Sequence, residues 1–195
     1  MPLPPLARTQ PDCVTFGKSI GGGAGHLLSG AILLHESAKL RESAKTALQS
    51  HTYAGSSARA LANGATLLET LEEWRPNVRA IGDGVAPIAA DLNEKSGGAV
   101  IAHGQGALWG GMFAHVDPAA RTKANLDFKA RCAEAKVLPY FVPIGGFMLT
   151  PRYDDDPETY AQAVKEMAAC ALETVKEMKW DEKDLLPTAP QKAMA

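Results

Sequence analysis

Cysteine and long apolar runs are scarce in this sequence of 195 residues. The three cysteines, Cys13, Cys132 and Cys170, are odd in number and far apart, so neither a disulfide framework nor a zinc site is indicated. No apolar run approaches the roughly 18 residues that span a bilayer, and the first residues lack the apolar segment of a secretory signal. We therefore expect a cytoplasmic protein without a membrane segment, although an organellar protein whose transit peptide is removed or omitted would also fit.

An excess of charge of one sign is also missing, because 20 basic side chains oppose 22 acidic ones and the formal net charge is -2. Such a chain has no overall field that would gather phosphate backbones or anionic lipids, so nucleic-acid binding is disfavoured. Hydrophobic residues, in contrast, make up 46% of the sequence. This content allows a buried core in one domain or in two small ones.

The first part of the chain has an α/β pattern. Residues 13–16 are β-prone and lead into a glycine-rich loop, and residues 35–49 have helical composition. From Ala58 onward, apolar side chains recur every three or four residues, as they do on one face of a helix. Beyond Trp74 and Pro76 the texture of the sequence changes. Apolar residues again recur every three or four positions there, and Pro87 predicts a kink or a break. We place a subdomain boundary near Arg75.

The second part has an α+β pattern. Two helices are expected after Asp117-Pro118 and Asp156-Pro157, because each pair supplies a cap and a first-turn proline. After Trp180 the sequence becomes polar and carries prolines. Strands are expected at residues 99–102, 107–116, 137–142 and 147–150. The chain thus divides into residues 1–75, an α+β subdomain at 76–180 and a flexible tail at 181–195.

Lys18 lies in the glycine-rich loop GKSIGGG, directly after the first expected strand. A lysine held at a strand end by such a turn is suited to forming an imine with an aldehyde cofactor, because a partly desolvated amine loses its proton more readily. The alternative is an exposed surface lysine, which is the commoner state of an arbitrary lysine. Both interpretations remain open at this point.

Two phosphate-binding motifs could use the same glycines, and neither fits. Gly17-Lys18-Ser19 matches the end of the phosphate loop G-x-x-x-x-G-K-[ST], but Asp12 stands where that motif needs its first glycine. The dinucleotide pattern G-x-G-x-x-G, read from Gly21, meets His26 in place of its last glycine.

The segment PDCVTFGKSIGGG, at residues 11–23, resembles the P-D-x-x-T-x-G-K-x-I-G-G-G segment of class III (omega-type) aminotransferases, which depend on pyridoxal phosphate. In that family the lysine of this segment forms the Schiff base with the cofactor. The resemblance implies that Lys18 is the Schiff-base lysine. It also implies that Lys18 is the base that moves a proton between the substrate α-carbon and the cofactor.

A second match, HTYAG at residues 51–55, is similar to the T-[FY]-x-G segment that precedes a long alanine-rich helix in the same family. The family's threonine binds the cofactor phosphate through its hydroxyl and backbone amide, across the dimer interface. The resemblance gives this role to Thr52. Taken alone, a threonine before a helix is more often a turn or capping residue.

The rest of the chain resembles the carboxy-terminal subdomain of the family. GQGALWG at 104–110 is similar to R-G-x-G-L-x-x-G, and MLTP at 148–151 is similar to R-x-x-P before the last helix. Met148 stands where many members have an arginine that holds the substrate carboxylate, which a methionine cannot do. Arg152 is either a substitute for that arginine or a solvated turn residue.

No metal site is expected. The five histidines form no i, i+4 pair and no Cys/His cluster, so we interpret them as structural, with His26 and His51 as the two that could border the cofactor. Asp154-Asp155-Asp156 is interpreted as a solvated turn and a helix cap.

Complete members of the family carry, before the lysine segment, the other phosphate-binding turn and the aspartate paired with the pyridine nitrogen, whereas ten residues precede Pro11 here. The resemblance thus implies a partial fold-type I architecture, with residues 1–75 as the end of the large pyridoxal-phosphate domain and residues 76–180 as the small domain. A truncated chain, a degenerate protein and one half of a split enzyme are three explanations. We expect a homodimer or association with a missing amino-terminal half.

The implied function is transamination between an amino donor and a keto acid or aldehyde, by a chain that is incomplete as it stands. An aminomutase or decarboxylase of the same family would use the same cofactor chemistry. A non-catalytic truncated association module, which keeps the small subdomain and binds no cofactor, is the alternative from another class. The family resemblance indicates the chemistry and not the substrate.

Overall fold

The computed structural model of the chain describes residues 13–16, 31–34, 58–143 and 145–187. The chain divides into two compact units, Met1–Glu73 and Trp74–Ala195. In the first unit, strand β1 (Cys13–Phe16) pairs antiparallel with strand β2 (Ala31–Leu34). β1 is the strand expected from the sequence, and the helix expected at residues 35–49 lies outside the described residues.

Helix α2 (Ala58–Lys95) is a single helix that runs through both Pro76 and Pro87. Of the two outcomes expected at Pro87, a kink or a break, the break is therefore wrong. Each proline lies at an exposed position, where water can compensate for the helical hydrogen bond that the missing N–H cannot make. On the other side of the helix, Ile81, Val85, Ala89 and Leu92 are buried in the core, and this apolar face keeps the helix continuous.

The second unit contains a four-stranded antiparallel sheet in the order β3-β4-β6-β5. Each of the four expected strands has a counterpart, although the observed strands are mostly shorter or shifted. β6 pairs with both β4 and β5, so it lies between two strands that precede it in the chain. The strands are β3 (Val100–Gln105), β4 (Leu108–Phe113), β5 (Tyr140–Val142) and β6 (Gly146–Leu149).

Helices α3 (Pro118–Glu134) and α4 (Pro157–Met178) begin where the sequence predicts. The carboxylate of Asp117 accepts a hydrogen bond from the backbone amide of Ala119 at 2.9 Å, and that of Asp156 accepts one from Thr159 at 2.8 Å. Each cap satisfies an amide that the first helical turn leaves unpaired. None of the described helices combines the length and the apolar character needed to cross a membrane.

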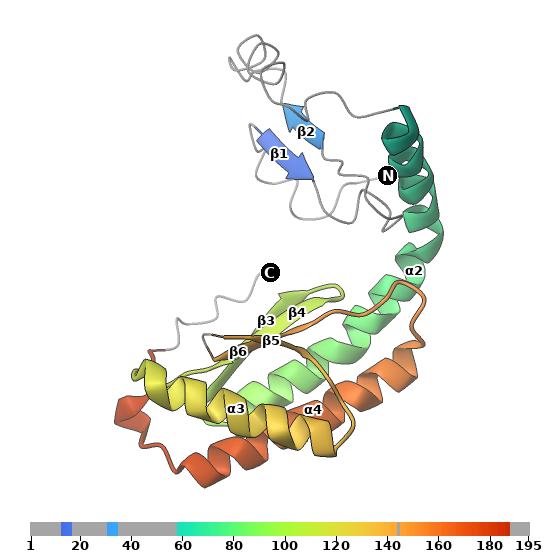
Figure 1. Cartoon of the computed structure of the whole chain (residues 1–195). Coiled ribbons are helices and arrows are strands. Elements are labelled where there is room, and N and C mark those ends of the chain that lie inside the picture. The colour runs from blue at the N-terminus through green and yellow to red at the C-terminus, as the bar shows by residue number, and fades with distance from the viewer. Residues whose placement is uncertain (1–12, 17–30, 35–57, 144, 188–195) are drawn as a thin grey trace. The chain divides into compact units, whose positions relative to one another are not determined.

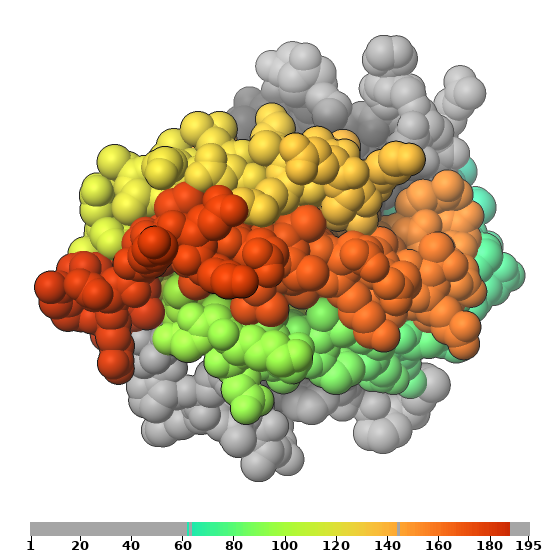
Figure 2. All heavy atoms as spheres, turned by 90° about the horizontal axis from the view of Figure 1, so that it is seen from below, coloured from blue at the N-terminus to red at the C-terminus, as the bar shows by residue number. Residues whose placement is uncertain are grey.

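The three helices lie together on one face of the sheet (Figure 1). Seen from the helical side, α4 lies between α3 and α2 (Figure 2). The centre of the core is Phe128 of α3, whose fully buried ring lies 5.5 Å from Phe113, 5.7 Å from Phe141 and 5.2 Å from Phe147, measured between ring centroids. These partners belong to β4, β5 and β6, so one side chain joins the helical layer to three strands.

The sequence predicts a loose tail after Trp180, but the described part of this segment, which ends at residue 187, is bonded to the rest of the second unit. It forms a short 3-10 helix, Glu182–Asp184, and then runs beside the end of β4. The amide of Leu186 donates to the carbonyl of Ala114 at 2.7 Å, and the Trp180 ring packs against the ring of Phe113. The polar composition did not predict this, because the ordering comes from backbone bonds and one aromatic contact.

Helix α2 and the β3–β4 hairpin approach each other backbone to backbone at Gly82. A Cβ built on Gly82 would lie 2.4 Å from the carbonyl carbon and oxygen of Gly106, which turns the hairpin with φ of +57°. A backbone cannot move aside as the end of a flexible side chain can. Only glycine therefore fits at position 82.

We predict that Gly82→Ala lowers the free energy of unfolding by about 1–3 kcal/mol, because the added methyl group overlaps the Gly106 peptide. Gly84→Ala is the matched control, since it lies in the same helix and its Cβ would meet the Cβ of Ala161 at 3.4 Å, an ordinary contact. The control should gain about 1 kcal/mol of helix propensity. Urea denaturation measures both, and equal stabilities of the two variants would contradict the close approach.

Candidate functional site

Lys18 and Thr52, the two residues assigned to the cofactor from the sequence, lie outside the described residues. The neighbouring elements are described: β1 ends at Phe16, just before Gly17 and Lys18, and α2 begins at Ala58, shortly after Thr52. His26 and His51 are also outside the described part of the chain. The roles given to these residues therefore stay predictions.

The sheet face opposite the helices carries Met148, the residue at the expected arginine position. The strand registers place Met148 of β6 in one row across the sheet with three other residues. These are His103 of β3, Gly110 of β4 and Tyr140 of β5. Met148 is 38% exposed and Tyr140 60% exposed. A second row on this face consists of Ile101, Met112, Gly146 and Val142.

Apart from two glycines, most residues of these two rows have apolar side chains. Their titratable side chains are His103 and Tyr140, and no guanidinium is among them. A thioether such as that of Met148 gives no fork of donors to a carboxylate. The face therefore suits contacts with apolar groups, and these two rows lack the fork of donors with which an arginine holds a carboxylate.

Arg152 lies in the loop between β6 and α4. Its Nη2 is 2.6 Å from Oδ2 of Asp154, its backbone amide donates to Oδ2 of Asp155 at 2.7 Å, and its side chain is 76% exposed. Asp156 caps α4, and the hydrogen bond from the Thr159 amide lowers the pKa of its carboxyl. Of the two interpretations of Arg152, these contacts favour the solvated turn residue. They also give each of the three aspartates a hydrogen-bond donor within this loop and the first turn of α4.

Asn77 of α2 anchors this loop, and the sequence gave no signal for it. Its Nδ2 donates to the carbonyl oxygens of Tyr153 at 2.8 Å and of Asp155 at 2.9 Å. One asparagine in a helical pattern is indistinguishable from a surface residue until its distant partners are known. The bonds fix where α4 begins relative to α2.

His115 and Trp109 have structural roles. Nδ1 of His115 accepts a hydrogen bond from the backbone amide of Asp117 at 3.0 Å, and its ring lies 4.8 Å from that of Trp180. Nε1 of Trp109 donates to the carbonyl of Gly106 at 2.6 Å and closes the β3–β4 turn. Among the described residues, no three His, Cys, Asp or Glu side chains are grouped so that they could hold a metal ion.

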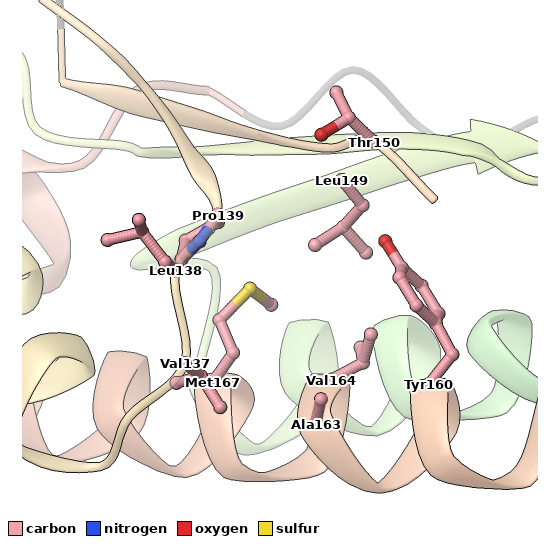
Figure 3. A pocket seen from close by; sticks show the side chains of 9 residues that line it. All are labelled: Val137, Leu138, Pro139, Leu149, Thr150, Tyr160, Ala163, Val164 and Met167. Carbon is pink, nitrogen blue, oxygen red and sulfur yellow. The ribbon is translucent and has the colours of Figure 1, made fainter. Parts of the chain in front are cut away.

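A small cavity of about 110 Å³ lies between α4, the end of β6 and the segment that leads into β5 (Figure 3). Its lining is apolar apart from Thr150 and Tyr160, and the Tyr160 hydroxyl points toward the end of β6. Burial raises the pKa of Tyr160 to about 12, with a smaller contribution from the charge of Asp155. The cavity could hold a small apolar group, but it contains no group that would transfer a proton near neutral pH.

We predict that the phenol of Tyr160 titrates at about pH 12, whereas an ordinary tyrosine titrates at about 10. Because folding raises this pKa, its contribution to stability is complete below about pH 10 and is lost as the pH rises toward 12. The measurement is the ultraviolet difference titration of the native protein against Tyr160→Phe. If Tyr160→Phe instead removes a component of the titration with a pKa of about 10, the value of an ordinary tyrosine, the phenol of Tyr160 is not buried.

Cys132 and Cys170, far apart in the sequence, are brought together by the packing of α3 on α4. Cys132 is fully buried, Cys170 is half-buried, and their thiols are within hydrogen-bonding reach of each other. Spacing along the chain did not reveal this contact, because it depends on how the two helices pack.

Comparisons with known proteins find the same architecture in transaminases. No family model matches the chain, and no curated protein matches it. An (S)-enantioselective omega-transaminase from Thermomicrobium roseum matches with a TM-score of 0.60 and 22% identity, over 86% of this chain and 38% of that one. An omega-transferase from Vibrio fluvialis JS17 matches with a TM-score of 0.63 and 18% identity, over 88% and 42%. An S-selective transaminase from Bacillus megaterium gives 0.62 and 17%, over 89% and 40%.

The chain has the fold of the carboxy-terminal part of a transaminase. This confirms the predicted α/β class with an α+β subdomain and a partial fold-type I architecture. The chain spans about 40% of the length of the transaminases it matches. At identities of 17–22% the likeness establishes the fold alone.

Proposed function

We propose that this chain carries the cofactor lysine of a pyridoxal-phosphate-dependent aminotransferase, with Lys18 in that role and Thr52 as a ligand of the cofactor phosphate. The segment at residues 11–23 carries the proposal, because its lysine follows β1 directly and matches the family segment along its whole length. The transaminase fold of the described part supports it. Residues 1–75 would provide the cofactor contacts and residues 76–180 the small domain.

Each proposed residue has a distinct task. Bound pyridoxal phosphate supplies an electron sink for the negative charge that develops at the substrate α-carbon. The Lys18 amine would bond covalently to the cofactor aldehyde and, once displaced by the amino donor, take and return the proton of the α-carbon. The hydroxyl and amide of Thr52 would hold the phosphate and so orient the ring. The amino group would pass from an amino donor to a keto acid or aldehyde.

The assembly follows from the role of Thr52. In the resembling family the phosphate-binding threonine reaches into the neighbouring subunit, so a homodimer, or a complex with a second polypeptide that supplies the remaining cofactor contacts, is part of the proposal. A pyridine-nitrogen carboxylate is one such contact, and it keeps the cofactor an effective electron sink. The proposed location is the cytoplasm.

We predict that the purified protein acquires the visible absorbance of lysine-bound pyridoxal phosphate when the cofactor is added, and that Lys18→Ala abolishes it. Lys165→Ala is the matched control, because it removes an exposed lysine of α4 and should leave the absorbance unchanged. Absorbance titration followed by gel filtration measures retained cofactor. An unchanged absorbance in Lys18→Ala would refute the assignment, and no absorbance in the unmodified protein would favour the non-catalytic association module.

Thr52→Ala should raise the Kd for pyridoxal phosphate about 10-fold to 100-fold, because a hydrogen bond to a charged group contributes about 1.5–3 kcal/mol. Thr52→Ser keeps the hydroxyl and should bind almost as tightly as the unmodified protein. The same absorbance titration compares the three proteins. If the alanine variant binds as tightly as the serine variant, the hydroxyl does not hold the phosphate.

A further inference from the structure

The seam between α3 and α4 contains two thiols that no part of the proposed reaction uses. Cys132 lies near the end of α3 with 0% of its surface exposed, and Cys170 lies in α4 at the edge of the same core cluster. Their side chains are within hydrogen-bonding reach of each other. Cys170 is half-buried, whereas Cys132 is fully buried, so Cys170 is the more exposed of the two residues.

The surroundings hold this pair in place. Nη2 of Arg131, the residue before Cys132, is 2.5 Å from Oε1 of Glu177, so an ion pair joins the two helices along the same seam. The carbonyl of Cys170 accepts a hydrogen bond from Oγ1 of Thr174 at 2.9 Å. Both helices pack on the sheet through fully buried side chains, such as Phe128 and Ala171. The thiols therefore stay close together as long as the second unit is folded.

We propose that Cys132 and Cys170 form a reversible disulfide that joins α3 to α4, and that Cys170 is the thiol that a low-molecular-weight disulfide reaches first. The inference goes beyond the proposed transamination and does not depend on it. It assigns a modification site to two residues of the small-domain core.

The oxidation is a thiol–disulfide exchange in two steps. The Cys170 thiolate attacks one sulfur of the small disulfide, which forms a mixed disulfide and releases one small thiol. Cys132 then loses its proton and attacks the Cys170 sulfur, which forms the internal disulfide and releases the second small thiol. The two protein thiols are oxidised, one small disulfide is reduced to two thiols, and the two protons leave on those thiols.

Burial makes the exchange slow at neutral pH. Desolvation raises the pKa of Cys132 to about 12, and it also raises that of Cys170, against the opposing effects of the Cys132 hydrogen bond and the Arg131 charge. Because the thiolate is the attacking species, the rate should keep increasing with pH above 8.5, where an ordinary thiol is already half ionised. Both cysteines would remain thiols in a reducing compartment and would join under oxidising conditions.

The test uses the full chain with Cys13→Ser, so that two thiols remain, and oxidised glutathione at pH 9. After alkylation of free thiols, mass spectrometry should show the loss of two hydrogens and a peptide that links Cys132 to Cys170, and a reductant should reverse both changes. Cys132→Ala, which keeps the core apolar, should instead stop at a glutathione adduct on Cys170. Cys170→Ser should leave Cys132 unmodified, because that thiol is fully buried.

Two results would overturn the proposal. One is a stable glutathione adduct on Cys170 while Cys132 in the same molecule stays reduced, and the other is no loss of either thiol under conditions in which the unfolded chain is oxidised. Thermal unfolding provides a second readout that does not rely on variants. The oxidised protein should melt about 5 °C or more above the reduced protein, and an equal or lower midpoint would show that the folded structure does not favour the bond.

Discussion

The ring of Phe128 is the contact on which the second unit depends. It is fully buried and meets the rings of Phe113, Phe141 and Phe147 in edge-to-face or tilted geometry, so that α3 is joined to three of the four strands at one point. Such aromatic pairs contribute about 0.5–1.5 kcal/mol each beyond the burial of their surface. Because these rings all point toward the helices, the alternate residues of the same strands, Met148 among them, lie on the opposite face.

The sequence predicted those features that depend on neighbouring residues. Asp117 and Asp156 followed by proline indicated where α3 and α4 begin, and β-prone runs indicated the strands of the second unit. Features that depend on distant partners could not be predicted. Pro87 signals a break by local rules, yet the buried face of α2 outweighs the loss of one hydrogen bond at an exposed position. The pairing of β6 between β4 and β5 has no local signal either.

The same division applies to the candidate site. Lys18 and Thr52 were predicted from two short segments that resemble segments of class III aminotransferases, and the described fold is similar to the carboxy-terminal part of transaminases. Asn77 gave no signal, because it acts through backbone carbonyls 76 and 78 positions away. The sheet face around Met148 gives information on carboxylate binding that the segment around Lys18 does not. The two rows of side chains on that face include no guanidinium, so they lack the fork of donors that holds a carboxylate.

The central claim is that Lys18 is the residue that binds pyridoxal phosphate covalently. Reduction with borohydride fixes a link between pyridoxal phosphate and a lysine amine, and peptide mapping then identifies the lysine that carries it. The account predicts one dominant labelled peptide, which contains Lys18, at cofactor concentrations that leave the other lysines unlabelled. Label distributed over exposed lysines with Lys18 unmodified would contradict it.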